Sequence, residues 1–75
     1  MGNSKRNVGE RIAYYRKLQG LTQKELGALA GVRQERLSNI ETGMRVVPIS
    51  RLARIAWALG VSLKELLGDT EGEEK

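Results

Sequence analysis

The sequence predicts an all-α protein in which five short helices pack as one compact domain. Apolar residues recur at steps of three and four along five segments, which is the period of a helix with one buried face. A glycine follows each segment, and a capping pattern precedes two of them. A chain of 75 residues has material for only one small core, so the helices are expected to share it.

The first two helices are separated by a glycine and a capping pattern. The first is expected over residues 8–18 and ends near Gly20, which suits the left-handed conformation that closes many helices. The Thr22 side chain can accept a hydrogen bond from the Glu25 backbone N–H, and the Glu25 side chain can accept one from the Thr22 N–H. This capping pattern predicts a second helix that begins at Thr22 and stops at Gly31. Their buried stripes are expected to be Val8, Ile12 and Tyr15, and then Leu26, Leu29 and Ala30.

Only a tight corner fits between the second helix and the third, which is expected over about residues 34–42 and ends at Gly43. Two helices that cross through such a corner need a small residue at their closest approach and a residue that tolerates positive φ. Gly27 and Gly31 meet these two needs. The residues expected to anchor the third helix are Val32, Leu37 and Ile40.

A loop over residues 44–47 leads to the fourth helix, where Pro48 suits the first turn and Gly60 the end. Ser62 and Glu65 repeat the capping pattern and predict a fifth helix that ends before Gly68. The apolar residues of these helices are Leu52, Ile55, Ala56 and Leu59, followed by Leu63, Leu66 and Leu67.

The charge of the chain is unevenly distributed. Residues 1–68 hold 12 Lys and Arg against 5 Asp and Glu, while residues 69–75 hold 4 acids and one Lys. We expect residues 1–7 to be a flexible N-terminus, residues 8–68 to form the domain, and residues 69–75 to be a disordered acidic tail without an apolar anchor. A basic body attracts polyanions, although a basic surface can also serve solubility alone.

The composition argues against several classes of function. Without Cys and His, the chain has no disulfide, no thiolate or imidazole metal ligand, and no nucleophile that needs such a partner. We therefore expect no enzyme activity, no metal and no cofactor. No apolar run approaches the roughly 18 residues that cross a bilayer, and the N-terminus is polar rather than signal-like, so no membrane partner and a cytoplasmic location are expected.

The segment from Leu21 to Gly43, LTQKELGALAGVRQERLSNIETG, resembles the XRE-type helix-turn-helix family, which includes phage lambda-like repressors and Cro. The resemblance continues through the Pro48 loop and the stretch IAWALGVS from Ile55, and it covers about residues 8–68. Several separated motifs agree in order and spacing, which makes it more specific than a lone helix-turn-helix pattern. It implies that the third helix enters the major groove of double-stranded DNA, while the N-terminus of the second meets the backbone.

The outer face of the third helix is then the expected base-reading surface. Gln34 and Asn39, which are expected to share one face, can each bond an adenine, and Arg33 can bond a guanine. Glu35 can accept from a cytosine amine, pair within the helix, or reject wrong bases. Arg33 stands where the family usually has Ser or Thr, which removes a side-chain helix cap. The base-reading candidates are Arg33, Gln34, Glu35, Ser38 and Asn39, and simple solvation of a polar face is the alternative.

Other side chains are expected to hold the DNA backbone or the fold. The phosphate-binding candidates, which can instead be ordinary surface residues, are Gln23, Arg36, Thr42 and Arg45. The resemblance also implies an internal ion pair between Arg16 and Glu41, which would tie the first helix to the end of the third.

Proteins of this type generally bind DNA as two-fold dimers, so the resemblance implies a homodimer. Trp57 lies off the apolar stripe of its helix and is the expected interface anchor, with partial burial against the last helix or the tail as the alternative. The residues that can share either role are Leu63, Leu66 and Leu67.

Together these features predict a sequence-specific DNA-binding transcriptional regulator, a repressor that binds a pseudo-palindromic operator as a dimer. Two alternatives stay open. The main partner can be a protein, as for an antitoxin or an anti-regulator that binds through its fourth and fifth helices. The chain can also be the DNA-binding piece of a longer repressor.

Overall fold

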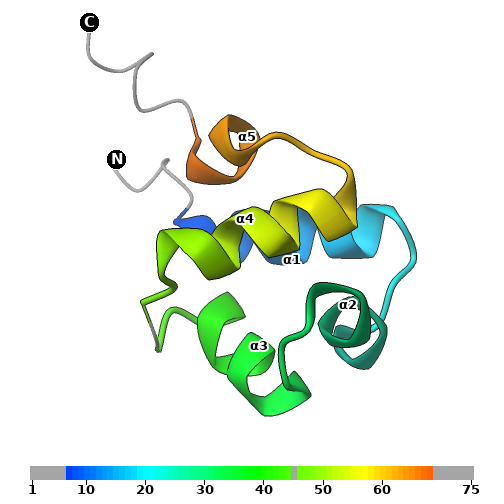
Figure 1. The fold of residues 1–75 in the computed structure, drawn as a ribbon. Helices are drawn as coiled ribbons and strands as arrows, with labels where there is room; N and C mark the ends of the chain where they lie inside the picture. The colour runs from blue at the N-terminus through cyan, green and yellow to red at the C-terminus, as the bar shows by residue number, and fades with distance from the viewer. Residues whose placement is uncertain (1–6, 45, 69–75) are drawn as a thin grey trace, which may run out of the picture.

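The computed structural model describes residues 7–44 and 46–68, which form five α-helices joined by short turns (Figure 1). No strand occurs in this part of the chain, and the predicted all-α class and helix order are confirmed. The candidate Arg45 and the acidic tail lie outside the described residues. The helices are α1 (Val8–Leu18), α2 (Gln23–Ala30), α3 (Gln34–Glu41), α4 (Ile49–Leu59) and α5 (Leu63–Leu67).

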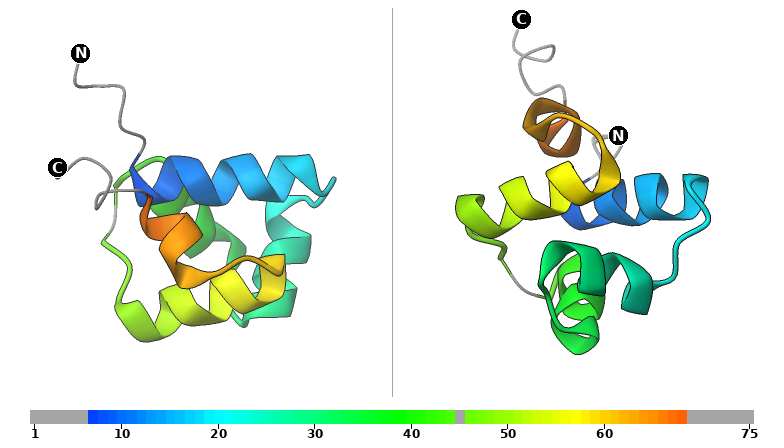
Figure 2. Two further views of the ribbon diagram at one scale, coloured as in Figure 1. Left: turned by 90° about the horizontal axis from the view of Figure 1, so that it is seen from above. Right: turned by 45° about the vertical axis from the view of Figure 1, so that its right-hand side comes forward.

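The helices are stacked in three levels. α1 and α4 run across the middle, α2 and α3 lie below them, and α5 lies above (Figure 1). α2 packs against α3 and α4, while α1 packs against α3, α4 and α5. The start of α1 and the end of α5 meet at one end of the domain (Figure 2). Among the described helices, none has the length and hydropathy required to cross a membrane.

Every helix contributes at least one fully buried side chain to a single core. Each fully buried Leu or Ile contributes about 1.5 to 3 kcal/mol through the hydrophobic effect, so the core holds all five helices together as one unit. The largest of these side chains are Ile12, Leu26, Leu37, Leu52, Ile55 and Leu66.

The prediction that Leu29 lies in the buried stripe of α2 is wrong, because its side chain is 54% exposed. The buried face of this helix is formed by Leu26, Gly27 and Ala30. At 3.6 residues per turn, Leu29 points about 110° away from the middle of that face. Close packing at Gly27 therefore sets the rotation of α2 about its axis, and the Leu29 side chain is left in contact with solvent.

Both predicted capping boxes form. The Thr22 hydroxyl accepts from the Glu25 N–H at 3.0 Å, and the Glu25 carboxylate accepts from the Thr22 N–H at 2.8 Å. Ser62 and Glu65 make the same reciprocal pair at the start of α5. Each pair satisfies two backbone donors that a helix start otherwise leaves without partners.

The other three helix starts differ from the predictions at two positions and agree with them at one. Asn7, expected to belong to the flexible N-terminus, instead caps α1, because its side-chain oxygen accepts from the Glu10 N–H at 2.8 Å. Asn is a preferred capping residue, so this signal was available in the sequence. Arg33 precedes α3 and makes no side-chain cap, as the departure from Ser or Thr predicts. Pro48 lies just before α4 rather than inside its first turn.

Two glycines allow close approach between backbones. At the corner, Gly31 has φ +73°, and a Cβ on Gly27 would overlap the carbonyl oxygen of Val32, so both residues serve as expected. Gly9 of α1 was not predicted to matter, yet a Cβ there would overlap the carbonyl oxygen of Ile40 and lie 2.9 Å from that of Glu41. Gly9 therefore lets α1 lie directly against the end of α3.

We expect Gly9→Ala to lower the free energy of unfolding by about 1 to 3 kcal/mol, because the new methyl group must displace the backbone of α3. Thermal denaturation followed by circular dichroism measures the loss. The control is Ala53→Gly, at an exposed position of α4. Ala53→Gly should lower the free energy of unfolding by about 0.5 to 1 kcal/mol, because glycine inside a helix is less favourable than alanine. Helix propensity alone would therefore make Gly9→Ala stabilising, so a loss of stability there reports the close contact. A Gly9→Ala protein that melts at or above the wild-type temperature would contradict the close contact.

Candidate nucleic-acid interface

One buried carboxylate connects three helices. Glu41, at the end of α3, is 9% exposed and accepts from Arg16 of α1 at 2.7 Å (Nε) and 3.0 Å (Nη2). Its Oε1 also accepts from Gln23 Nε2, in the first turn of α2, at 3.0 Å. The remaining Arg16 nitrogen, Nη1, donates to the Leu21 carbonyl oxygen at 2.9 Å. The ion pair that the resemblance implied is thus present, and it fixes the ends of these helices relative to one another.

Two predicted phosphate-binding residues have partners inside the protein. The Gln23 amide donates one hydrogen to Glu41, which fixes the direction of its side chain and leaves a second amide hydrogen for another acceptor. The Thr42 hydroxyl donates to the carbonyl oxygens of Ser38 and Asn39, at 3.1 and 3.2 Å. The Thr42 hydroxyl is therefore hydrogen-bonded to the last turn of α3. Phosphate contacts by Gln23 and Thr42 stay predictions.

The predicted base-reading residues lie on the outer side of α3, while Leu37 and Ile40 face the core. The expectation that Gln34 and Asn39 share one face is wrong, because five residues at 3.6 per turn separate their directions by about 140°. Glu35 and Asn39, one turn apart, lie nearest the middle of the outer face, and Gln34 lies toward its edge. The exposed members of the set are Arg33, Gln34, Glu35 and Asn39, and Ser38 is half-buried.

Four arginines lie on α3, directly before it, or on α4. α3 carries two acidic residues. Glu41 is already bound to Arg16, so Glu35 is the other acid on this helix. Within residues 7–44 and 46–68, no ion pair or hydrogen bond engages the side chains of these arginines. Two of them come from α4, which the sequence analysis treated as a core and dimer helix. They are Arg33 and Arg36 beside or on α3, and Arg51 and Arg54 on α4.

The predicted dimer residues have very different exposures. Trp57 is 78% exposed, so it is not buried against the last helix, while the tail, the other alternative, lies outside the described residues. Leu66 is fully buried in its own chain and has no surface to offer to a second subunit. Leu63 is half-buried, and Leu67 is 43% exposed.

These exposed residues belong to two separate apolar surfaces. Trp57, near the end of α4, borders a groove together with Leu29 and Arg54. Leu67 borders another groove with Val46 and Ile49, at the start of α4. Ile49 and Trp57 are eight residues apart, or about 12 Å along the helix, so the two grooves lie toward opposite ends of α4.

A three-residue corner, a short helix with a polar outer face, and surrounding arginines define the class of helix-turn-helix DNA-binding proteins. The sequence profile of the helix-turn-helix family matches residues 12–66. The chain is also 42% identical over 64 residues to the uncharacterized HTH-type transcriptional regulator y4dJ of Sinorhizobium fredii, covering 85% of this chain and 83% of that protein. It therefore belongs to the XRE-type helix-turn-helix family of DNA-binding transcription regulators.

Two further likenesses concern the regulator SinR. The chain is 37% identical over 68 residues to the HTH-type transcriptional regulator SinR of Bacillus licheniformis, covering 89% of this chain and 61% of SinR. A solved structure described as SinR, the master regulator for biofilm formation, in complex with DNA has a TM-score of 0.75 to this fold. The two are 39% identical, with 80% of this chain and 97% of that chain covered.

We expect Arg16→Met to lower the free energy of unfolding by about 3 to 5 kcal/mol, because it leaves the buried Glu41 carboxylate without its cationic partner. Urea denaturation measures the loss. The control is the double variant Arg16→Met with Glu41→Leu, which leaves no unpaired buried charge and should recover part of the stability. Equal stability of Arg16→Met and the wild type would show that the pair does not hold the helices.

Proposed function

We propose that this protein binds a pseudo-palindromic operator as a homodimer and represses transcription by occupying it. The observation that carries the proposal is the polar outer face of α3, presented on a helix whose position is fixed by the Arg16–Glu41 pair. The DNA-bound structure of SinR supports it. Double-stranded DNA is the proposed partner and the cytoplasm the proposed location, while the absence of enzyme activity and of a cofactor stays a prediction.

In this proposal α3 lies in the major groove with its N-terminal end toward the bases. Asn39 and Gln34 bond adenines through their amides, and Arg33 bonds a guanine. Glu35 and Ser38 face the groove from the same helix, where Glu35 excludes bases that present only acceptors. The proposed backbone contacts are Gln23, Arg36, Thr42 and Arg45.

A second subunit doubles the number of bases read. In helix-turn-helix dimers, two equivalent helices lie about 34 to 36 Å apart and contact successive turns of the major groove. We propose that Trp57 anchors this dimer, and that the exposed Leu29 beside it extends the apolar contact. Aromatic side chains are frequent anchors of protein interfaces because they bury a large area at a low cost in entropy.

The base-reading assignment is tested by selecting bound sequences from a random pool of duplexes. We expect Asn39→Ala and Gln34→Ala each to lose discrimination at one position of the selected site, by about 1 to 3 kcal/mol. Arg36→Ala is the matched comparison, because loss of a phosphate contact weakens all sequences alike. An unchanged base preference in both amide variants would overturn the readout assignment.

The dimer assignment is tested by sedimentation equilibrium. We expect Trp57→Ala to shift the protein toward monomer, because it removes the largest exposed apolar side chain near the end of α4. Val46→Ser is the control, since Val46 is 93% exposed on the other apolar surface. If Val46→Ser dissociates the dimer and Trp57→Ala does not, the interface lies at the start of α4 instead.

A further inference from the structure

We propose that Arg54 of α4 is a positioning residue for DNA reading, because its guanidinium compensates the negative end of the α2 dipole and so holds the corner from which α3 begins. The corner comprises residues 31–33, between the last residue of α2 and the first of α3. The inference rests on the proposed reading of DNA by α3. It gives a role to an arginine that forms no ion pair or hydrogen bond within the described residues.

The first observation is the set of open carbonyl groups at the end of α2. The Gly31 and Val32 N–H groups both donate to the carbonyl oxygen of Gly27. The next three carbonyl oxygens, those of residues 28–30, accept no hydrogen bond from the part of the chain that the structure describes. Open carbonyl groups at a helix end carry the partial negative charge of the helix dipole, which a nearby cation stabilises.

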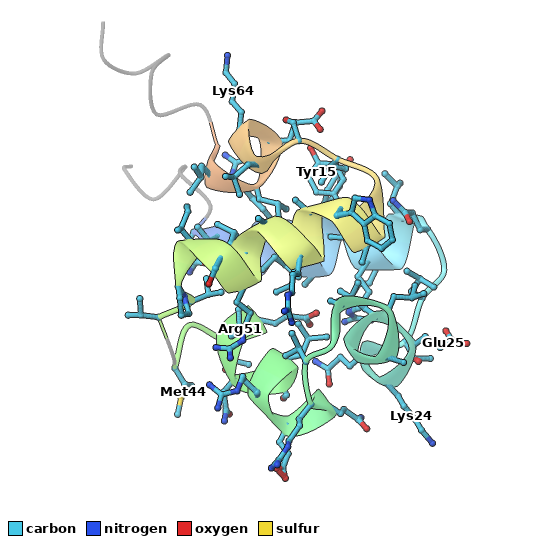
Figure 3. All side chains as sticks on the ribbon, viewed as in Figure 1. Tyr15, Lys24, Glu25, Met44, Arg51 and Lys64 are labelled. Atoms are coloured by element: carbon cyan, nitrogen blue, oxygen red, sulfur yellow. The ribbon has the colours of Figure 1, made fainter. Side chains whose placement is uncertain are left out.

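The second observation is that α2 carries no cation of its own at this end. Its last turn contains no basic residue, and its one Lys or Arg, Lys24, is in the first turn. The side chains of Lys24 and Glu25 extend from α2 away from α4 (Figure 3). A cation that compensates the end of α2 must therefore come from another helix.

The third observation is that Arg54 supplies this charge from α4. Its Nη1 atom is 3.4 Å from the point where a Cβ of Gly31 would lie, so the guanidinium is held against the residue that closes α2. Arg54 also borders a groove together with the last residues of α2 and with Trp57. Because α2 and α4 pack against each other, the contact needs no rearrangement of the fold.

The corner held in this way leads directly into α3. This helix begins at Gln34, three residues after Gly31, and Arg33 gives it no side-chain cap. A helix start without a side-chain cap is less stable, so the first turn of α3 depends more on the contacts of the corner. Arg54 thus positions Gln34, a proposed base-reading residue, without touching the DNA itself.

A direct contact between Arg54 and a DNA phosphate is the alternative, since the side chain is exposed. The observations favour the corner, because the guanidinium already lies beside the partial negative charge of α2. The other residues that line its groove are apolar or glycine, and none of them is a further cation for a phosphate. A phosphate contact also has a signature of its own, the salt dependence of binding.

The inference is tested first by moving the charge from α4 to α2. Arg54→Gln should lower the Tm by about 2 to 6 °C, because a cation near a helix C-terminus stabilises a small domain modestly. Adding Ala28→Lys, at an exposed position in the last turn of α2, should restore most of this loss. The matched control is Lys24→Gln, which removes the same charge at the other end of α2 and should not lower the Tm. A double variant that melts like Arg54→Gln alone would overturn the inference.

The second readout is base discrimination, measured by fluorescence anisotropy with duplexes that the wild type selects. At the position where Gln34→Ala loses discrimination, Arg54→Gln should lose about two- to fivefold, and the double variant should regain it. The slope of log affinity against log salt should stay that of the wild type in Arg54→Gln. A slope smaller by about 0.9 would show a phosphate contact and overturn the inference. Because the Tm measurements need no DNA, a wild type that selects no sequence refutes the operator proposal, while the charge transfer still decides whether Arg54 holds the corner.

Discussion

The contact between Arg16 and Glu41 is the interaction on which the placement of α3 depends. α3 has eight residues, and an isolated helix of that length is not stable in water. Its position must therefore come from tertiary contacts. Leu37 and Ile40 supply apolar burial, but such contacts tolerate some rotation and sliding of a helix. The ion pair tolerates little rotation or sliding, because the Glu41 carboxylate must bind Arg16 and Gln23 together while Arg16 also donates to the Leu21 carbonyl oxygen. A buried pair of this kind contributes more to geometry than to net stability.

Close approach between backbones is the second constraint. The end of α3 lies near α1 because Gly9 leaves room for the carbonyl oxygens of Ile40 and Glu41. The corner closes because Gly27 makes room for the Val32 carbonyl and Gly31 adopts a left-handed backbone. These three positions bring the inner side of α3 against α1 and α2. Its polar outer side is left without protein neighbours, which is the condition for entering a DNA groove.

The fourth helix combines several roles along its length. Its inner side supplies Leu52 and Ile55 to the core, and its last turns expose Trp57.

By itself, the sequence determined mainly the features whose partners lie within about one helical turn. The five helices, both capping boxes and the glycine corner were predicted because periodicity, Thr22 with Glu25, Ser62 with Glu65, and the left-handed Gly31 are local. The Arg16–Glu41 pair joins residues 25 apart, and it was expected only through the family resemblance. The tertiary structure alone decided the exposure of Leu29 and Trp57, the close contact at Gly9 and the hydrogen bond from Gln23 to Glu41. Each depends on how a helix is rotated about its axis and which distant residue it meets, and local spacing does not encode that rotation. It is set by the shared core and by the one carboxylate that three helices must satisfy.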